Sequence, residues 1–341
     1  MTGNSAASGS APILRVEGIS KRFVKPLGWA ERLANRLGAS HRETVVQALD
    51  DVSLDVAHGE VLGIVGESGC GKSTLGRIIA GLMPPSSGRV IFSAPDLGGA
   101  AASAVSAGAR GGARLARQMI FQDPSASLNP RMRVLGQVGE AAVAHGLVTA
   151  SDMRGYVLTL LRQVGLDDSA LDRYPHQFSG GQRARIGIAR ALAVKPELLV
   201  CDESVAALDV SVQAQVLNLF AELRRALGLT YVFISHDLGV VRHLSDRVAV
   251  MYLGRVVEIG PVAEIFSAPR HPYTQALLAA MPRVQTGRQQ FAAIRGEVAS
   301  PVNPPGGCHF HPRCPRAEAR CAVETPVVAE REGVRVMCHF S

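Results

Sequence analysis

Short apolar runs and helical patterns alternate along the chain. The runs Val61–Val65, Leu198–Cys201 and Tyr231–Ile234 are apolar throughout, which is typical of strands buried on both faces of a parallel sheet. A helical pattern follows the first run, from Leu75 to Leu82, and a second helix is predicted from Gly181 to Val194. Strands that alternate with helices in this way predict an α/β fold with a parallel sheet.

Less regular segments divide the rest of the chain. The N-terminus is rich in Ser, Gly and Ala, and a central stretch of Ala, Gly, Ser and Arg is too poor in large apolar residues to fold by itself. We therefore expect a disordered N-terminus (1–12), a main domain (13–260) and a C-terminal extension (261–341). Within the main domain we expect an exposed insertion (24–44), a flexible loop (93–117) and a helical subdomain (123–178).

Composition and charge narrow the function classes. The chain has 341 residues, 47% of them hydrophobic, so it can bury a full core. Its longest apolar runs are strand-sized and far below the ~18 residues of a membrane-spanning helix. The N-terminus lacks the pattern of a secretory signal, so we expect a cytoplasmic protein whose membrane link comes through partners. We interpret the net charge of +7 as charge scattered over the surface rather than as a nucleic-acid-binding patch.

A glycine-rich loop joins the first buried run to the first predicted helix. It fits the pattern G-x-x-x-x-G-K-S/T, and the flanking strand and helix make a chance glycine-rich turn the weaker interpretation. In such a loop the backbone N–H groups surround the phosphates of ATP, Lys72 reaches the β- and γ-phosphates, and Ser73 binds Mg²⁺. The predicted phosphate-binding residues are Gly66, Glu67, Ser68, Gly69, Cys70, Gly71, Lys72, Ser73 and Thr74. A reagent that modifies the Cys70 thiol is expected to inhibit, with protection by ATP, unless that thiol is buried.

Two carboxylates end the second buried run. Asp202 is expected to contact Mg²⁺, and Glu203 to act as the general base or to position the attacking water. An acidic strand end is common by itself, but beside a phosphate loop it indicates an ATP-hydrolysing site.

The segment Phe178–Gln182 reads F-S-G-G-Q and resembles the signature sequence of ATP-binding-cassette (ABC) ATPases. The resemblance implies that Ser179, Gly180, Gly181 and Gln182 bind the ATP of a partner subunit in a head-to-tail dimer. It also implies a RecA-like parallel sheet core with an antiparallel β subdomain and an inserted helical subdomain.

Further positions resemble other elements of this family. Gln122 resembles the glutamine that senses Mg²⁺ and the attacking water, and His236 the histidine that contacts the γ-phosphate. The resemblance thus implies a Mg²⁺ site formed by Ser73, Gln122 and Asp202, and catalysis by Glu203, His236, Gln122 and Lys72. Phe23 resembles the aromatic residue that stacks on adenine, although a core phenylalanine is nearly as well supported. Ser204 and Ala206 depart from the Pro and Ser that the family usually has there.

Three longer segments resemble the oligopeptide/dipeptide/nickel importers: Phe121–Arg131, Ala207–Gln215 and His271–Ala276. The similarity is greatest to the second of the two paired ATPases of oligopeptide permeases. It implies a paralogous ATP-binding subunit, two transmembrane permeases, an external substrate-binding protein, and a peripheral location on the cytoplasmic face of the membrane. Peptides are the favoured substrate; nickel or glutathione, and more remotely a nucleic-acid-linked ABC ATPase, are the alternatives.

Four cysteines lie close together in the C-terminal extension: Cys308, Cys314, Cys321 and Cys338. In a reducing compartment such clustering favours a metal over disulfides, and four thiolates suit Zn²⁺ or a 4Fe-4S cluster. The importer family's tail resembles this pattern and implies the 4Fe-4S cluster, with Zn²⁺ as the alternative.

Overall fold

The computed structural model describes residues 12–37, 40, 43–93, 103–104, 115–281, 296–297 and 299–341. Residues 1–11 of the predicted disordered N-terminus and most of the predicted 93–117 loop lie outside this part. Across the described residues, no helix is both long and apolar enough to cross a membrane.

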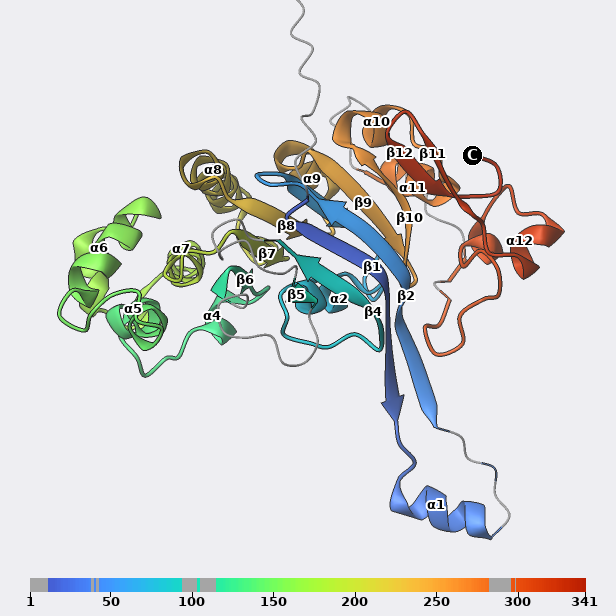
Figure 1. The fold of residues 1–341 in the computed structure, drawn as a ribbon, viewed down its shortest axis with the longest axis horizontal. Coiled ribbons are helices and arrows are strands. Elements are labelled where there is room, and N and C mark those ends of the chain that lie inside the picture. Colours follow the sequence, from blue (N-terminus) through green and yellow to red (C-terminus); the bar gives the residue numbers. More distant parts are fainter. Residues whose placement is uncertain are drawn as a thin grey trace, which may run out of the picture.

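A mixed eight-stranded sheet forms the centre of the molecule, in the order β11-β12-β10-β9-β3-β8-β7-β6 (Figure 1). The five strands from β9 to β6 are parallel to one another, as the alternating pattern predicts. The other three join antiparallel at one edge. The strands are β3 (Val61–Val65), β6 (Arg117–Ile120), β7 (Leu198–Asp202), β8 (Thr230–Ile234), β9 (Arg247–Tyr252), β10 (Arg255–Pro261), β11 (Val328–Arg331) and β12 (Val334–Met337). Every residue of β3, β7 and β8 is buried, which explains the apolar runs Val61–Val65, Leu198–Cys201 and Tyr231–Ile234.

A second, antiparallel sheet lies over one face of the first. Its order is β2-β1-β4-β5, formed by β1 (Leu14–Lys25), β2 (Thr44–Val56), β4 (Ser87–Phe92) and β5 (Ser103–Ala104). Helix α2 (Lys72–Ile79) lies between the sheets, and Leu75, Ile78 and Ile79 share one apolar cluster with residues of both. This packing holds α2 in place, so residues 66–71 form the loop that joins β3 to α2.

Helices cover the other face of the central sheet and extend to one side. The apolar cluster on that face joins α7 (Gly180–Leu192), α8 (Val210–Leu227) and α9 (Leu238–Leu244) to β7 and β8. Residues 123–178 lie beside α7 and contain α4 (Pro124–Ser127), α5 (Val134–Ala144), α6 (Met153–Gln163) and the 3-10 helices η2 (Asp168–Asp172) and η3 (Pro175–Gln177) (Figure 1).

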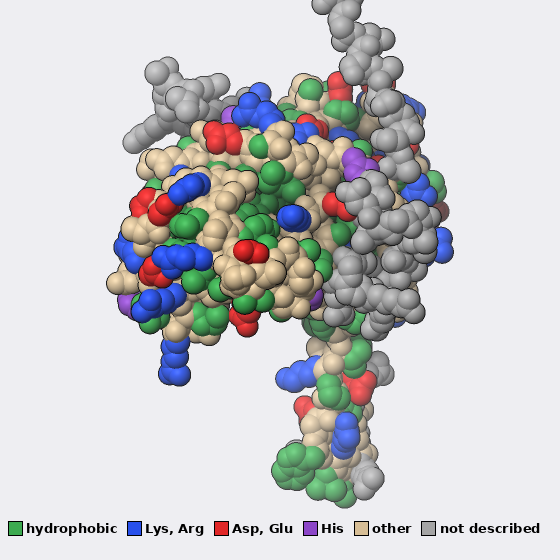
Figure 2. Space-filling model, turned by 60° about the vertical axis from the view of Figure 1, so that its left-hand side comes forward, with side chains coloured by type: hydrophobic (Ala, Val, Ile, Leu, Met, Phe, Trp, Pro, Cys, Tyr) green, Lys and Arg blue, Asp and Glu red, His purple; other side chains and the backbone are tan. Residues whose placement is uncertain are grey.

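The hairpin of β1 and β2 projects from the body and carries helix α1 (Trp29–Arg36) at its tip (Figure 1). The predicted insertion therefore contains a helix that the sequence analysis did not anticipate. Trp29 and Leu37 are 83% and 82% exposed, and hydrophobic side chains gather at the tip (Figure 2).

The C-terminal extension adds two strands to the edge of the central sheet. Strand β12 pairs with β10 in the register Glu258–Val336, and β11 pairs with β12. Its helices are α10 (Val262–Ser267), α11 (Pro272–Ala279), η4 (His311–Arg313) and α12 (Ala319–Val323). Tyr273, Phe310 and Val334 of the extension share an apolar cluster with β9 residues of the main domain.

Candidate ATP site

The phosphate loop has a backbone that its glycines require. Gly69 and Gly71 have φ values of +79° and +106°, which L side chains rarely adopt. A Cβ on Gly71 would lie 2.4 Å from the carbonyl oxygen of Ala48, and one on Gly66 would lie 2.2 Å from that of Met251. The loop therefore passes between β2 and β9 and leads directly into the start of α2.

Lys72 closes the loop from inside. Its side chain is buried, and Nζ donates hydrogen bonds to the carbonyl oxygens of Gly66 at 2.8 Å and Glu67 at 3.0 Å. Nζ also lies 3.9 Å from Sγ of Cys70, so the side chain is held inside the loop, where an incoming phosphate would bind.

Ser73 and Asp202 meet at the end of β7. The Ser73 hydroxyl donates to Oδ1 of Asp202 at 2.8 Å. Burial raises the pKa of Asp202 and the Glu203 carboxylate acts in the same direction, whereas the hydrogen bond from Ser73 opposes them. A hydroxyl and a carboxylate beside a phosphate loop are oxygen ligands of the kind Mg²⁺ prefers, so these residues fit the predicted ion.

Glu203 links the two remaining predicted catalytic residues. Its Oε2 accepts a hydrogen bond from Nε2 of Gln122 at 2.9 Å and lies 3.4 Å from Nδ1 of His236. Glu203 has φ +46°, unusual for a residue with a side chain, and its N–H donates to the carbonyl of Ile234. Glu203, Gln122 and His236 each lie one or two residues after the end of β7, β6 or β8. The three side chains therefore meet at the same edge of the central sheet.

The signature residues form a separate site at the start of α7. Ser179 and Gln182 cap the helix reciprocally: the Ser179 hydroxyl accepts from the Gln182 N–H, and the Gln182 side chain accepts from the Ser179 N–H. Gly181 packs against Val212 of α8. Helix α7 stands with α5 and α6, apart from α2 (Figure 1), so Ser179, Gly180, Gly181 and Gln182 do not join the phosphate loop of their own chain.

Phe23, the predicted adenine-stacking residue, is partly exposed, whereas Cys70 of the phosphate loop is buried. Phe23 is 40% exposed and pairs with Val46, two residues before Ala48, whose carbonyl faces the phosphate loop. A core role for Phe23 is therefore wrong. Cys70 is only 4% exposed, and burial raises the pKa of its thiol. This is the buried case in which a reactive Cys70 is not expected.

The predicted 4Fe-4S cluster, and metal binding by the tail, are wrong. Among the described residues, which include all four tail cysteines, no group of three or more His, Cys, Asp or Glu is placed to hold a metal ion. Cys308 and Cys314 pack against the apolar cluster of the extension. Burial is the largest cause that raises the pKa of both thiols, so they remain protonated at neutral pH.

Sequence reasoning missed two residues that reach the phosphate loop from the extension. The Glu67 N–H donates to the Tyr273 hydroxyl at 2.9 Å, and Arg313 forms an ion pair with the Glu67 carboxylate at 2.7 Å. They lie 206 and 246 residues from Glu67. Tyr273 falls in the His271–Ala276 segment that resembles the importers, but nothing in that segment indicates contact with the phosphate loop, and Arg313 is not among the residues singled out from the sequence.

Two family models match the chain: ABC transporter over residues 49–206, and oligopeptide/dipeptide transporter, C-terminal region, over residues 257–321. The chain is 47% identical over 333 residues to a probable peptide ABC transporter ATP-binding protein of Sinorhizobium fredii, which covers 97% of this chain and 90% of that protein. It is 48% identical over 287 residues to the oligopeptide transport ATP-binding protein OppF of Salmonella typhimurium, with 83% and 84% covered.

Solved structures are also similar. The cbiO1 part of an ABC transporter complex from Clostridium perfringens has a TM-score of 0.61 at 28% identity, over 76% of this chain and 92% of that one. A dimeric ATP-binding cassette bound to ADP and Pi has a TM-score of 0.60 at 25% identity, over 73% and 98%. The chain is thus 47% identical to the Sinorhizobium protein over 97% of its length, and its phosphate loop and Glu203 are in place. It belongs to the ABC transporter family and is an ATP hydrolase.

Proposed function

We propose that this chain powers a peptide importer by hydrolysing ATP at the interface of a head-to-tail dimer. The observation that carries the proposal is the position of Glu203, which touches both Gln122 and His236 beside the Ser73–Asp202 pair. The relatives named above are peptide and oligopeptide transport proteins, which favours peptides over nickel or glutathione.

Each residue of the site has a distinct role in this proposal. The loop N–H groups and Lys72 bind the β- and γ-phosphates, and Phe23 stacks on the adenine. Ser73, Asp202 and Gln122 hold Mg²⁺, which supplies charge neutralisation at the phosphates when bound. Glu203 positions the attacking water and accepts its proton, while His236 contacts the γ-phosphate.

The second half of each ATP site comes from a partner subunit. Because Ser179–Gln182 lie away from their own phosphate loop, the start of α7 is available to another chain's ATP. The N–H groups of Ser179 and Gln182 are used in the reciprocal cap, so those of Gly180 and Gly181 would face the phosphates. The dimeric solved structure bound to ADP and Pi supports such an arrangement. We propose a paralogous ATP-binding subunit as the partner, as in the importers that the sequence resembles.

A surface cavity marks the place proposed for a permease. It has a volume of about 550 Å³ and is lined by residues of α2's end, β6 and α5's end, among them Leu82, Phe121 and His145. Phe121 adjoins Gln122, so a permease helix seated here would act on the residue that touches Glu203. Two permeases, together with an external binding protein, complete the proposed importer and hold this subunit at the cytoplasmic face of the membrane.

The Glu203→Gln variant tests the assignment. It keeps the size of the side chain but removes the carboxylate, so ATP binding is retained while turnover falls by about 100-fold or more. Binding and steady-state hydrolysis are measured in the complex with permeases and partner, with Glu222→Gln, a change on α8, as the control. Full hydrolysis by Glu203→Gln would refute the role of Glu203.

A further inference from the structure

The C-terminal extension contacts the phosphate loop at Glu67, through an ion pair with Arg313 and a hydrogen bond with Tyr273. Arg313 donates from Nη1 to Oε2 of Glu67 at 2.7 Å and from Nη2 to Oε1 at 3.1 Å. The two bonds run in parallel, which is the strongest geometry for an arginine and a carboxylate. The Arg313 side chain is 5% exposed and that of Glu67 22%, so the pair is largely shielded from water.

Arg313 is itself held in place by aromatic residues. It follows Phe310 at the end of η4, and Phe310 packs edge-on against Tyr252 at 5.2 Å between ring centroids. Tyr252 places its hydroxyl 3.4 Å from Nη1 of Arg313, and Tyr273 packs on both rings. Tyr252, which Phe310 and Tyr273 hold in place, thus contacts the guanidinium on the side away from solvent and supports its position beside Glu67.

Glu67 is the second residue of the phosphate loop, and every polar group of it is occupied. Its N–H donates to Tyr273, its carbonyl accepts from Lys72 and from the Cys70 N–H, and its carboxylate pairs with Arg313. Two of these four partners, Tyr273 and Arg313, come from the extension. The extension thus fixes the conformation of the loop from outside, while Lys72 does so from inside.

The charge of Glu67 makes the arginine more than a support. A carboxylate in a loop that binds a triphosphate repels the ligand, and the repulsion is strong where water is scarce. Arg313 neutralises that carboxylate. Without Arg313, Glu67 would be left as a poorly solvated anion beside the phosphates.

We propose that Arg313 is a positioning residue for ATP binding, which acts by holding and neutralising Glu67 and so makes the affinity of the phosphate loop depend on the C-terminal extension. The proposal rests on the assignment of residues 66–74 as the ATP phosphate loop.

The test is a double-mutant cycle on the full chain with a fluorescent ATP analogue and Mg²⁺. Arg313→Ala is expected to weaken binding by about tenfold, and the loss should shrink at high salt because it comes from repulsion. Adding Glu67→Gln to Arg313→Ala should restore most of the affinity, since the unpaired charge is gone. A role in packing alone predicts no such recovery.

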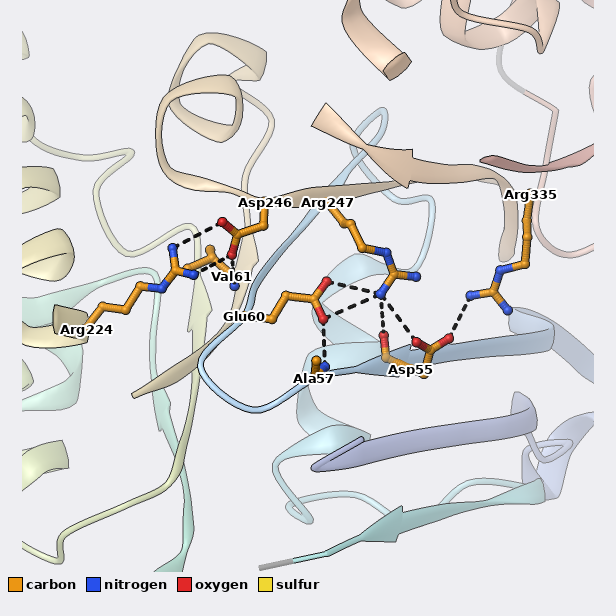
Figure 3. Close-up of polar contacts among 8 residues, drawn as sticks. All are labelled: Asp55, Ala57, Glu60, Val61, Arg224, Asp246, Arg247 and Arg335. Atoms are coloured by element: carbon orange, nitrogen blue, oxygen red, sulfur yellow. Dashed lines mark hydrogen bonds and ion pairs between the residues drawn. The ribbon is translucent and has the colours of Figure 1, made fainter. Parts of the chain in front are cut away.

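The chain offers a matched control in a second ion pair between extension and main domain. Arg335 of β12 donates to Asp55 of β2 at 2.9 Å, and Asp55 also meets Arg247 (Figure 3). Arg335→Ala removes a more exposed, single-bonded tether that does not contact the phosphate loop, so its affinity for the analogue should stay within about twofold of the parent. Arg313→Lys, which keeps the charge but loses the parallel bonds, should fall between the parent and Arg313→Ala, and it carries the test if Arg313→Ala does not fold.

Three outcomes would overturn the proposal: Arg313→Ala binding as the parent does, the double variant binding no better than Arg313→Ala, or Arg335→Ala weakening binding equally. Failure of the underlying site is recognised separately by Lys72→Ala. If that variant bound the analogue normally, the phosphate-loop assignment itself would be wrong, whatever Arg313 does.

Discussion

His271 makes the stability of the extension depend on pH. It caps α11, where its ring Nδ1 accepts a hydrogen bond from the backbone N–H of Tyr273 at 3.0 Å. The backbone N–H of His271 donates to the Glu258 carboxylate at 3.0 Å. The residue is 1% exposed. Burial lowers the pKa of His271 from 6.5 to about 3, so the ring is neutral in the folded protein at every physiological pH.

The sign and size of the effect follow from this difference. Below pH 6.5 the unfolded chain binds a proton at His271 that the folded chain does not, so the free energy of unfolding decreases as the pH falls towards 3. Between pH 7 and pH 5 the decrease from this residue is about 2 kcal/mol. Glu258 acts in the opposite direction, because burial raises its pKa and stability from this group is lost as the pH rises.

A His271→Asn variant isolates the histidine. Asn keeps an acceptor for the Tyr273 N–H but does not titrate, and Glu258 is present in both proteins. Urea unfolding at pH 7, 6 and 5, followed by circular dichroism, should show that the parent loses about 2 kcal/mol more than the variant on acidification. His58→Asn, a change at an exposed histidine, should leave the pH dependence of the parent intact. Parallel curves for parent and His271→Asn would refute the reasoning.

Two further predictions concern the phosphate loop. Because the Cys70 thiol is buried and its pKa is raised, iodoacetamide should modify it at least about tenfold more slowly in the folded protein than in urea, with little further protection by ATP; mass spectrometry of the labelled peptide would reveal rapid ATP-sensitive labelling if the prediction is wrong. Gly71→Ala should reduce ATP binding by about tenfold or more, because φ +106° and the Ala48 carbonyl at 2.4 Å leave no place for Cβ; Gly155→Ala, where no atom lies within 4 Å, is the control in the same binding assay.

The parts of the site that sequence predicts well are those encoded by neighbouring residues. The β3 strand, the phosphate loop and α2 follow one another, so glycine spacing and apolar runs are sufficient to locate them. The same holds for β7 with Asp202, and for α7, which begins at Gly180 rather than the predicted Gly181. Contact between Gln122, Glu203 and His236 was expected only through family resemblance.

The parts that sequence does not predict depend on contacts between distant segments. Arg313 meets Glu67 across 246 residues, and β12 is a strand because β10 provides a partner. The tail cysteines are the reverse case, in which the sequence pattern predicted a site that is absent from the described residues. Their close spacing indicated a metal site, but spacing alone does not fix the directions of four side chains, and here Cys308 and Cys314 serve in apolar packing.

A shortened chain that ended at Pro261 would leave β10 as an open edge. Glu258 and Ile259 would lose their partners on β12, next to side chains that are buried in the full protein. Uncovered edges of this kind recruit strands from other molecules and lead to self-association. A minimal ATPase fragment is therefore a poor choice for expression, and the extension is better dissected by single substitutions than by deletion.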